Sequence, residues 1–151
     1  MAPADTLFQG SATGPDAIRQ VTPHIHCTVF SPDGKYIFAT DFSADRILRF
    51  VMHPDNPIPH ASLEAVNIEE DSGPRHLTFS PNGKFAYLIT ELSGKVIAFS
   101  YDDGRLEQIQ TTTADTVAAR GSADIHLSPD GKSTVYASNR LKEDGIAIFA
   151  V

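Results

Sequence analysis

An arginine and a histidine open one apolar run of this sequence, and another histidine holds the matching place in an earlier run. Arg75 and His76 begin the segment RHLTF, and His26 lies in the segment HIHCTVF. His26 and Arg75 each lie five residues before the serine of the Ser-Pro turn that follows. Burying an unpaired charge is costly, so a fold alone would not require this pair. A histidine can act as a base near neutral pH, and an arginine can stabilise an oxyanion or hold a phosphate.

Two more charged residues follow apolar runs at similar places. Glu91 comes directly after YLIT, and Arg140 ends the segment YASNR. Glu91 also has an ordinary interpretation, as a solvated turn residue or as the ion-pair partner of Arg75. For Arg140 a structural role is equally open.

Alternation along a strand predicts which of these side chains share a face. Residues two apart point the same way, so His24 and His26 should share a face, and His76 should point away from Arg75. Two imidazoles on one face could bind a metal, but no third ligand is placed beside them. The sequence therefore predicts no metal site, and His24 alone fits a structural role at least as well.

Other polar residues are expected to be structural. Asp41 and Asp45, in ATDFSAD, have the spacing of turn-shaping residues, and His60 lies among prolines in an expected surface loop.

The elements that must position these residues occur three times. FSPDGK, FSPNGK and LSPDGK begin at residues 30, 79 and 127, so the copies are 49 and 48 residues apart. Ser-Pro-Asp-Gly fits a type I turn. The flanking runs are short and rich in Val, Ile, Phe, Tyr and Thr, which predicts strands, and several are apolar on both faces. A weaker fourth strand follows, as LEAVNI (63–68) and RLEQIQ (105–110).

Four short antiparallel strands in about 48 residues are typical of a β-propeller blade. The predicted fold is all-β, a partial propeller of about three four-stranded blades, and a β-sandwich with similar hairpins is the alternative. Three blades cannot close a ring, so we expect a piece of a longer propeller. The chain is expected to divide as an incoming connection (1–23) and blades at roughly 24–72, 73–121 and 122–151, the last incomplete.

Composition limits the classes of function. The chain has 151 residues, 41% of them hydrophobic, and a formal net charge of −7. The acidic balance argues against a nucleic-acid partner, and no apolar run is long enough to span a membrane. Cys27 is the one cysteine, which excludes an internal disulfide. Without a recognisable signal peptide, a cytoplasmic location is expected, with self-association through open blade edges.

Several segments together resemble one known family. GPDAIRQVTPHIHCTVFSPDGK, GPRHLTFSPNGKFAYLITEL and SADIHLSPDGKSTVYASNR are similar to the seven-bladed propeller lactonases, which include 6-phosphogluconolactonases and 3-carboxy-cis,cis-muconate cyclases. The resemblance implies a cofactor-free lactone hydrolase in carbohydrate metabolism, such as the pentose phosphate pathway, acting on a sugar lactone. It implies His26 and Glu91 as catalytic residues. The implied substrate-binding residues are Arg75, Arg140, His76, His24 and His126.

One departure affects the third repeat. GKSTVYASNR has one residue more between turn and strand than the family usually shows, and a one-residue slip would reverse the face of every side chain after it, including Arg140. Two other functions stay open: a non-catalytic propeller that serves as a binding platform, and an inactive fragment of the lactonase.

Overall fold

The computed structural model describes residues 9–52, 65–130, 134–142 and 144–151. Within these ranges all regular structure is β-strand. None of the described segments forms a helix that could cross a membrane. His60 and part of the third turn (131–133) lie outside the described residues.

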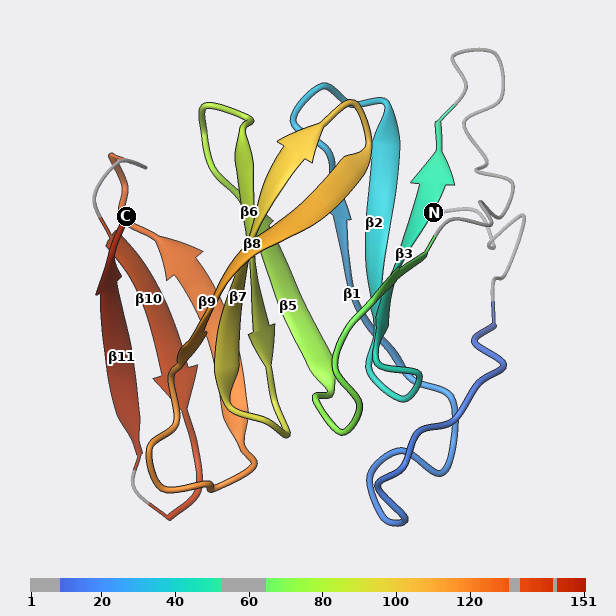
Figure 1. Cartoon of the computed structure of the whole chain (residues 1–151), viewed down its shortest axis with the longest axis vertical. Helices are drawn as coiled ribbons and strands as arrows, with labels where there is room; N and C mark the ends of the chain where they lie inside the picture. The colour runs from blue at the N-terminus through green and yellow to red at the C-terminus, as the bar shows by residue number, and fades with distance from the viewer. Residues whose placement is uncertain (1–8, 53–64, 131–133, 143) are drawn as a thin grey trace, which may run out of the picture.

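The strands form three antiparallel sheets that stand side by side (Figure 1). The first sheet has the order β1 (Ile25–Phe30), β2 (Tyr36–Asp41), β3 (Arg46–Val51) and β4 (Ala65–Asn67). The second has the order β5 (Pro74–Phe79), β6 (Phe85–Thr90), β7 (Lys95–Asp102) and β8 (Arg105–Thr113). The third contains β9 (Ser122–Leu127), β10 (Thr134–Asn139) and β11 (Gly145–Ala150).

Each sheet pairs strands that are consecutive in the chain, as a propeller blade does. The predicted all-β propeller architecture is thus confirmed, with two four-stranded sheets and a three-stranded one in the part of the chain that the structure describes.

The repeated turn fixes how the first two strands of each blade pair. In the first copy the Gly34 amide donates to the Ser31 carbonyl at 3.0 Å, and in the second Gly83 donates to Ser80 at 2.9 Å. Both glycines have a positive φ, 70° and 69°, which a side chain would strain. The next amide donates to the turn's Asp or Asn side chain, so the turn is closed twice and the register of the following strand is set.

The sheets pack face to face through apolar side chains. Leu88 and Ile89 are neighbours on β6, and neither is exposed to solvent. Leu88 belongs to the core shared with the first sheet, and Ile89 belongs to the core shared with the third. Because successive strand residues point to opposite faces, a central blade needs apolar residues at both, which explains runs such as FAYLIT.

The first strands of the three sheets, β1, β5 and β9, lie next to one another. Each has an irregular register at the same end, between Ile25 and Cys27, between Pro74 and His76, and between Ser122 and Ile125. A β-bulge breaks the strict alternation of side chains and re-aims them. The candidate functional residues lie at these bulges and at the ends of the strands that pair with them.

Candidate active site

Three arginines from different parts of the chain converge on the carboxylate of Glu91. Arg75 Nε donates to Oε2 at 2.7 Å, Arg19 donates to Oε1, and Arg140 Nη2 lies 3.3 Å from Oε1. The Glu91 side chain is 7% exposed and that of Arg75 15%, whereas Arg19 and Arg140 are 40% and 50% exposed. Glu91 is therefore the buried anchor of a cluster with excess positive charge.

The charges around Glu91 fix its protonation state. Burial raises the pKa of Glu91, but hydrogen bonds from Arg19 and Arg75 outweigh burial, and the pKa lies below its ordinary value. Glu91 is thus a carboxylate at neutral pH. Its ion pair with Arg75, which the sequence left as one of two interpretations, is present in the structure.

Glu91 and Arg140 occupy the same place in successive blades. Thr90, just before Glu91, pairs with Pro74, and Asn139, just before Arg140, pairs with Ser122. The Glu91 amide donates to the Gly73 carbonyl at 2.8 Å, and the Arg140 amide donates to the Gly121 carbonyl at 3.0 Å.

The extra residue of the third repeat does not displace Arg140. Phe79 pairs with Ala86, seven positions on, whereas Leu127 pairs with Val135, eight positions on. The insertion is therefore absorbed between β9 and β10, and the register of β10 is restored before Arg140.

The bulges explain why the prediction for His76 was wrong. We expected His76 to point away from Arg75, but both side chains reach β9: Arg75 donates to the carbonyl of Ala123, and His76 Nδ1 lies 2.5 Å from Asp124 Oδ1. Strict alternation does not hold across the irregular register between Pro74 and His76. Both side chains therefore reach the candidate site.

A threonine hydroxyl ties the first two bulges together. Thr40 Oγ1 accepts a hydrogen bond from the Cys27 amide at 3.0 Å and donates to the Arg75 carbonyl at 2.7 Å. This bridge lies beside His26, whose ring centroid is 5.1 Å from that of His76. Desolvation lowers the pKa of His26, the charge of Arg75 lowers it further, and the charge of Glu91 acts in the opposite direction. His26 is therefore neutral at pH 7 and able to accept a proton.

Asp124 links two further histidines at the edge of the site. Its Oδ2 lies 2.9 Å from His126 Nε2, and its Oδ1 is bound to His76. Burial opposes the shift, but the hydrogen bonds from both histidines lower the pKa of Asp124 to about 2. His126 has a side chain that is 75% exposed, so it stands at the rim.

His24 lies apart from His26. Its Nδ1 is 3.2 Å from Ser43 Oγ, and its ring meets Phe42 edge-on at 6.4 Å. His24 precedes β1, and the bulge separates it from the regular part of the strand, so the two imidazoles have different surroundings. Among the described residues, no three His, Cys, Asp or Glu side chains are grouped to hold a metal ion.

The segment before Arg75 is held in place by Asp45. Its carboxylate accepts hydrogen bonds from the amides of Asp71, Ser72 and Gly73 at 2.8–3.0 Å, which confirms a structural role for Asp45. Gly73 has a φ of 62°, and a Cβ there would lie 2.7 Å from the Phe42 ring. Glycine is thus required where the chain enters β5 beside Glu91.

Arg19 is the site residue that sequence reasoning did not assign. It lies outside the repeats, 72 positions before Glu91, so blade alignment gives it no equivalent. Its guanidinium also stands 5.7 Å from the centre of the Phe42 ring. The Arg-Gln pair within the family-like segment GPDAIRQVTPHIH is the signal that could have pointed to it.

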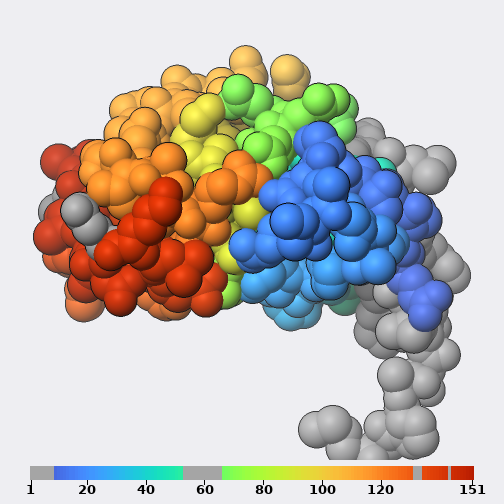
Figure 2. All heavy atoms as spheres, turned by 90° about the horizontal axis from the view of Figure 1, so that it is seen from below, coloured from blue at the N-terminus to red at the C-terminus, as the bar shows by residue number. Residues whose placement is uncertain are grey.

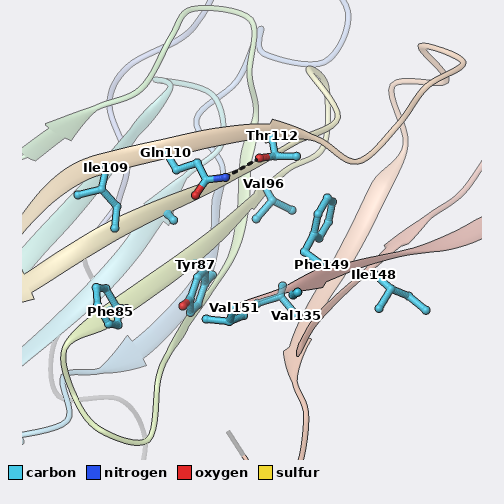
Figure 3. Close-up of a pocket in the computed structure, with 12 residues that line it drawn as sticks. Phe85, Tyr87, Val96, Ile109, Gln110, Thr112, Val135, Ile148, Phe149 and Val151 are labelled. Atoms are coloured by element: carbon cyan, nitrogen blue, oxygen red, sulfur yellow. Dashed lines mark hydrogen bonds between the residues drawn. The ribbon is translucent and has the colours of Figure 1, made fainter. Parts of the chain in front are cut away.

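A cavity of about 550 Å³ lies elsewhere, between the second and third sheets (Figure 3). Its lining is mainly apolar and includes Phe85, Tyr87, Val96, Ile148 and Phe149. None of the arginines or histidines of the Glu91 cluster lines it. It therefore offers no charged group for hydrolysis.

Comparisons with known proteins agree with the propeller fold. Residues 1–151 match the family described as "Lactonase, 7-bladed beta-propeller". A protein from Formosa agariphila named 6-phosphogluconolactonase is 39% identical over 97% of this chain and 43% of its own length. A solved structure from Bacteroides uniformis, provisionally named a 6-phosphogluconolactonase, is 95% identical, with a TM-score of 0.96 over 99% of this chain and 43% of that one.

A third relative is the periplasmic gluconolactonase of Pseudomonas aeruginosa. Its structure is 39% identical and superimposes with a TM-score of 0.79 over 87% of this chain and 38% of its own. The present chain thus spans less than half the length of the relatives it matches.

Proposed function

We propose that this chain, which belongs to the family of seven-bladed β-propeller lactonases, supplies a catalytic part of an enzyme that hydrolyses a sugar lactone to its acid. The observation that carries the proposal is the convergence of three arginines on buried Glu91 beside a neutral histidine. A lactone with an anionic group, such as 6-phosphogluconolactone, fits the excess positive charge. The relatives named for that activity support this choice of substrate.

The proposed reaction begins at His26. Its neutral imidazole removes a proton from water, and the water oxygen attacks the lactone carbonyl carbon. The ring C–O bond then breaks, and the alkoxide that leaves takes the proton from the imidazolium. The products are one carboxylic acid, which ionises, and one hydroxyl group, so atoms and charge balance.

The charged cluster stabilises what forms on this path. Arg75 and Arg140 donate hydrogen bonds to the developing oxyanion or to an anionic group of the lactone. Glu91 stays ionised, orients both guanidiniums, and favours the imidazolium form of His26 as it appears. His76, held by Asp124, lies against His26 and limits its movement.

The test uses a completed propeller, which we define as the full-length Bacteroides uniformis protein in which this chain replaces its matching segment. Acid release from 6-phosphogluconolactone and from gluconolactone would be followed at constant pH, and spontaneous hydrolysis subtracted. We expect enzymatic hydrolysis of at least one lactone. Hydrolysis of neither would contradict the proposal and favour a binding role.

The place of the enzyme in the cell is part of the same proposal. Cytoplasmic carbohydrate metabolism, as in the pentose phosphate pathway, suits a phosphorylated lactone. One relative is described as periplasmic, so cell fractionation with antibodies against the full-length protein is the direct test.

A further inference from the structure

We propose that Arg120 is a positioning residue that clamps the N-terminal turn (residues 14–20) so that Arg19 stays on Glu91. The inference rests on the proposed function, since it assigns a remote residue to the same site. Figure 2 shows the molecule from below, and the N-terminal turn belongs to the blue atoms on this side.

The N-terminal turn is closed by its own side chains. Asp16 Oδ1 accepts hydrogen bonds from the amides of Ile18 and Arg19, both at 2.8 Å. The Asp16 amide donates to Gln20 Oε1 at 3.1 Å, and Gln20 Nε2 donates to the Phe42 carbonyl at 2.9 Å. Gln20 is completely buried, so one end of the turn is anchored in the first blade.

Arg120 holds the other oxygen of Asp16 from a distant part of the chain. Arg120 Nη2 donates to Asp16 Oδ2 at 2.6 Å. The same guanidinium forms a two-pronged pair with Asp71, through Nη1 at 2.8 Å and Nη2 at 2.6 Å. One side chain thus joins the incoming segment, the connection before β5 and the connection before β9.

This contact differs from an ordinary surface ion pair. Isolated exposed pairs contribute little, but bidentate geometry within a network is the recognised exception. Asp16 is 14% exposed, and hydrogen bonds from the Arg19 and Ile18 amides, with that of Arg120, lower its pKa to about 2. Asp16 is therefore charged at any pH where the enzyme would work.

Arg120 sits in a braced and strained loop. Its φ is 57°, in the left-handed region that residues with a side chain rarely adopt. Asp115 accepts hydrogen bonds from the amides of Val117 and Ala119, and Lys142 donates to the Ala118 carbonyl at 3.0 Å. Such strain persists only where the surroundings fix it, which gives Arg120 a fixed position from which to hold the turn.

Arg19 is the residue that connects the N-terminal turn to Glu91. Asp16 fixes the backbone amide of Arg19, and Arg19 donates to Glu91. Because Arg19 is 40% exposed and sits in a turn, its side chain is free to leave Glu91 once the turn loosens. Arg120 is expected to act on Glu91 only by this route.

Two variants break the clamp from opposite sides. Asp16→Asn keeps a carbonyl oxygen for the amides of Ile18 and Arg19 but presents an amide group to Arg120, and Arg120→Gln removes the guanidinium. In the completed propeller each should lower kcat/KM three- to tenfold, with Arg19→Gln at about tenfold. Arg105→Gln, whose side chain is 77% exposed on β8, is the charge-matched control and should stay within twofold.

A double-mutant cycle separates positioning from general stability. If Arg120 acts through Arg19, the double variant Arg19→Gln/Arg120→Gln should be no worse than Arg19→Gln alone, within twofold. Arg120→Lys, which keeps the charge but loses the fork, should recover part of the loss. Multiplying effects, or an Asp16→Asn variant as active as wild type, would overturn the inference.

Limited proteolysis tests whether Arg120 holds the N-terminal turn, and it does not depend on enzyme activity. Trypsin cleaves after Arg19, and the rate reports local opening of the N-terminal turn. We expect cleavage there at least about tenfold faster in Asp16→Asn and in Arg120→Gln, and unchanged in Arg105→Gln. If the completed propeller hydrolyses no lactone, the proposed function fails, and unchanged cleavage in both variants would separately disprove the clamp.

Discussion

Replacing Glu91 by glutamine tests the centre of the proposed site. The change keeps the size of the side chain and one carbonyl oxygen but removes the charge that pairs with three guanidiniums. Arg75, only 15% exposed, would keep its charge without a charged partner, whereas Arg19 and Arg140 are exposed enough to be rehydrated.

The size of the effect follows from these exposures. An unpaired and largely buried guanidinium costs about 2–3 kcal/mol of unfolding free energy. The two half-exposed partners add less than about 1 kcal/mol in total because solvent screens them. Loss of the anion that orients the site and favours the imidazolium should lower kcat/KM about 10²- to 10⁴-fold.

The measurements are urea denaturation and lactone hydrolysis by the completed propeller. Glu107→Gln is the matched control, since the Glu107 side chain is 65% exposed on β8, and it should change the unfolding free energy by less than about 0.5 kcal/mol. A Glu91→Gln variant that is as active as wild type would refute the assignment. Reduced stability with unchanged activity would leave Glu91 as a structural residue only.

Four further predictions follow from individual contacts. Gly73→Ala should cost about 2–4 kcal/mol in urea denaturation, against about 1–2 kcal/mol for Gly34→Ala, because a Cβ meets packed side chains only at Gly73; equal losses would contradict this. Since the pKa of His26 is lowered, kcat/KM should rise with pH to a plateau, and the midpoint of this rise should lie below pH 6.5. His26→Asn should abolish the rise, and a midpoint above pH 6.5 in the wild type would exclude His26 as the base. Asp124 has a pKa of about 2 in the folded protein, so its ionised form should add about 1 kcal/mol to the free energy of unfolding, after discounting for 45% exposure. This contribution should be present above pH 4 and lost towards pH 2, and a loss of stability in Asp124→Asn that is the same at every pH would disprove this. Ile148 is 64% exposed on β11, so Ile148→Ser should reduce self-association of this chain in sedimentation experiments, and unchanged association would place the contact elsewhere.

The architecture was predictable because short segments of the sequence specify the turns and strands of each blade. Three turn sequences at near-equal spacing, with runs that are apolar on both faces, indicate stacked blades, and residues such as Leu88 and Ile89 fill the two cores. The equivalent places of Glu91 and Arg140, each directly after a strand, could also be read from the sequence, although the register that aligns them depends on where an inserted residue is accommodated.

The details of the site depended on departures from regular structure. Strict alternation predicted that His76 would point away from Arg75, and the bulge brings both to β9. A bulge cannot be predicted reliably from a single sequence, because its position depends on the pairing between strands. Arg19 escaped assignment for a related reason: its partner is distant in the chain, and only folding brings the two together.

Several contacts of the site link a blade to the next one in chain order. His26 meets His76, the hydroxyl of Thr40 holds the bulge of β5, and Arg75 reaches Ala123 on β9. The site therefore lies across the boundaries between successive blades. A circular permutant whose new termini lie in a distant connection would keep these blades next to one another and so keep the site. Exchanging the positions of two blades, even with intact turns and cores, would destroy it.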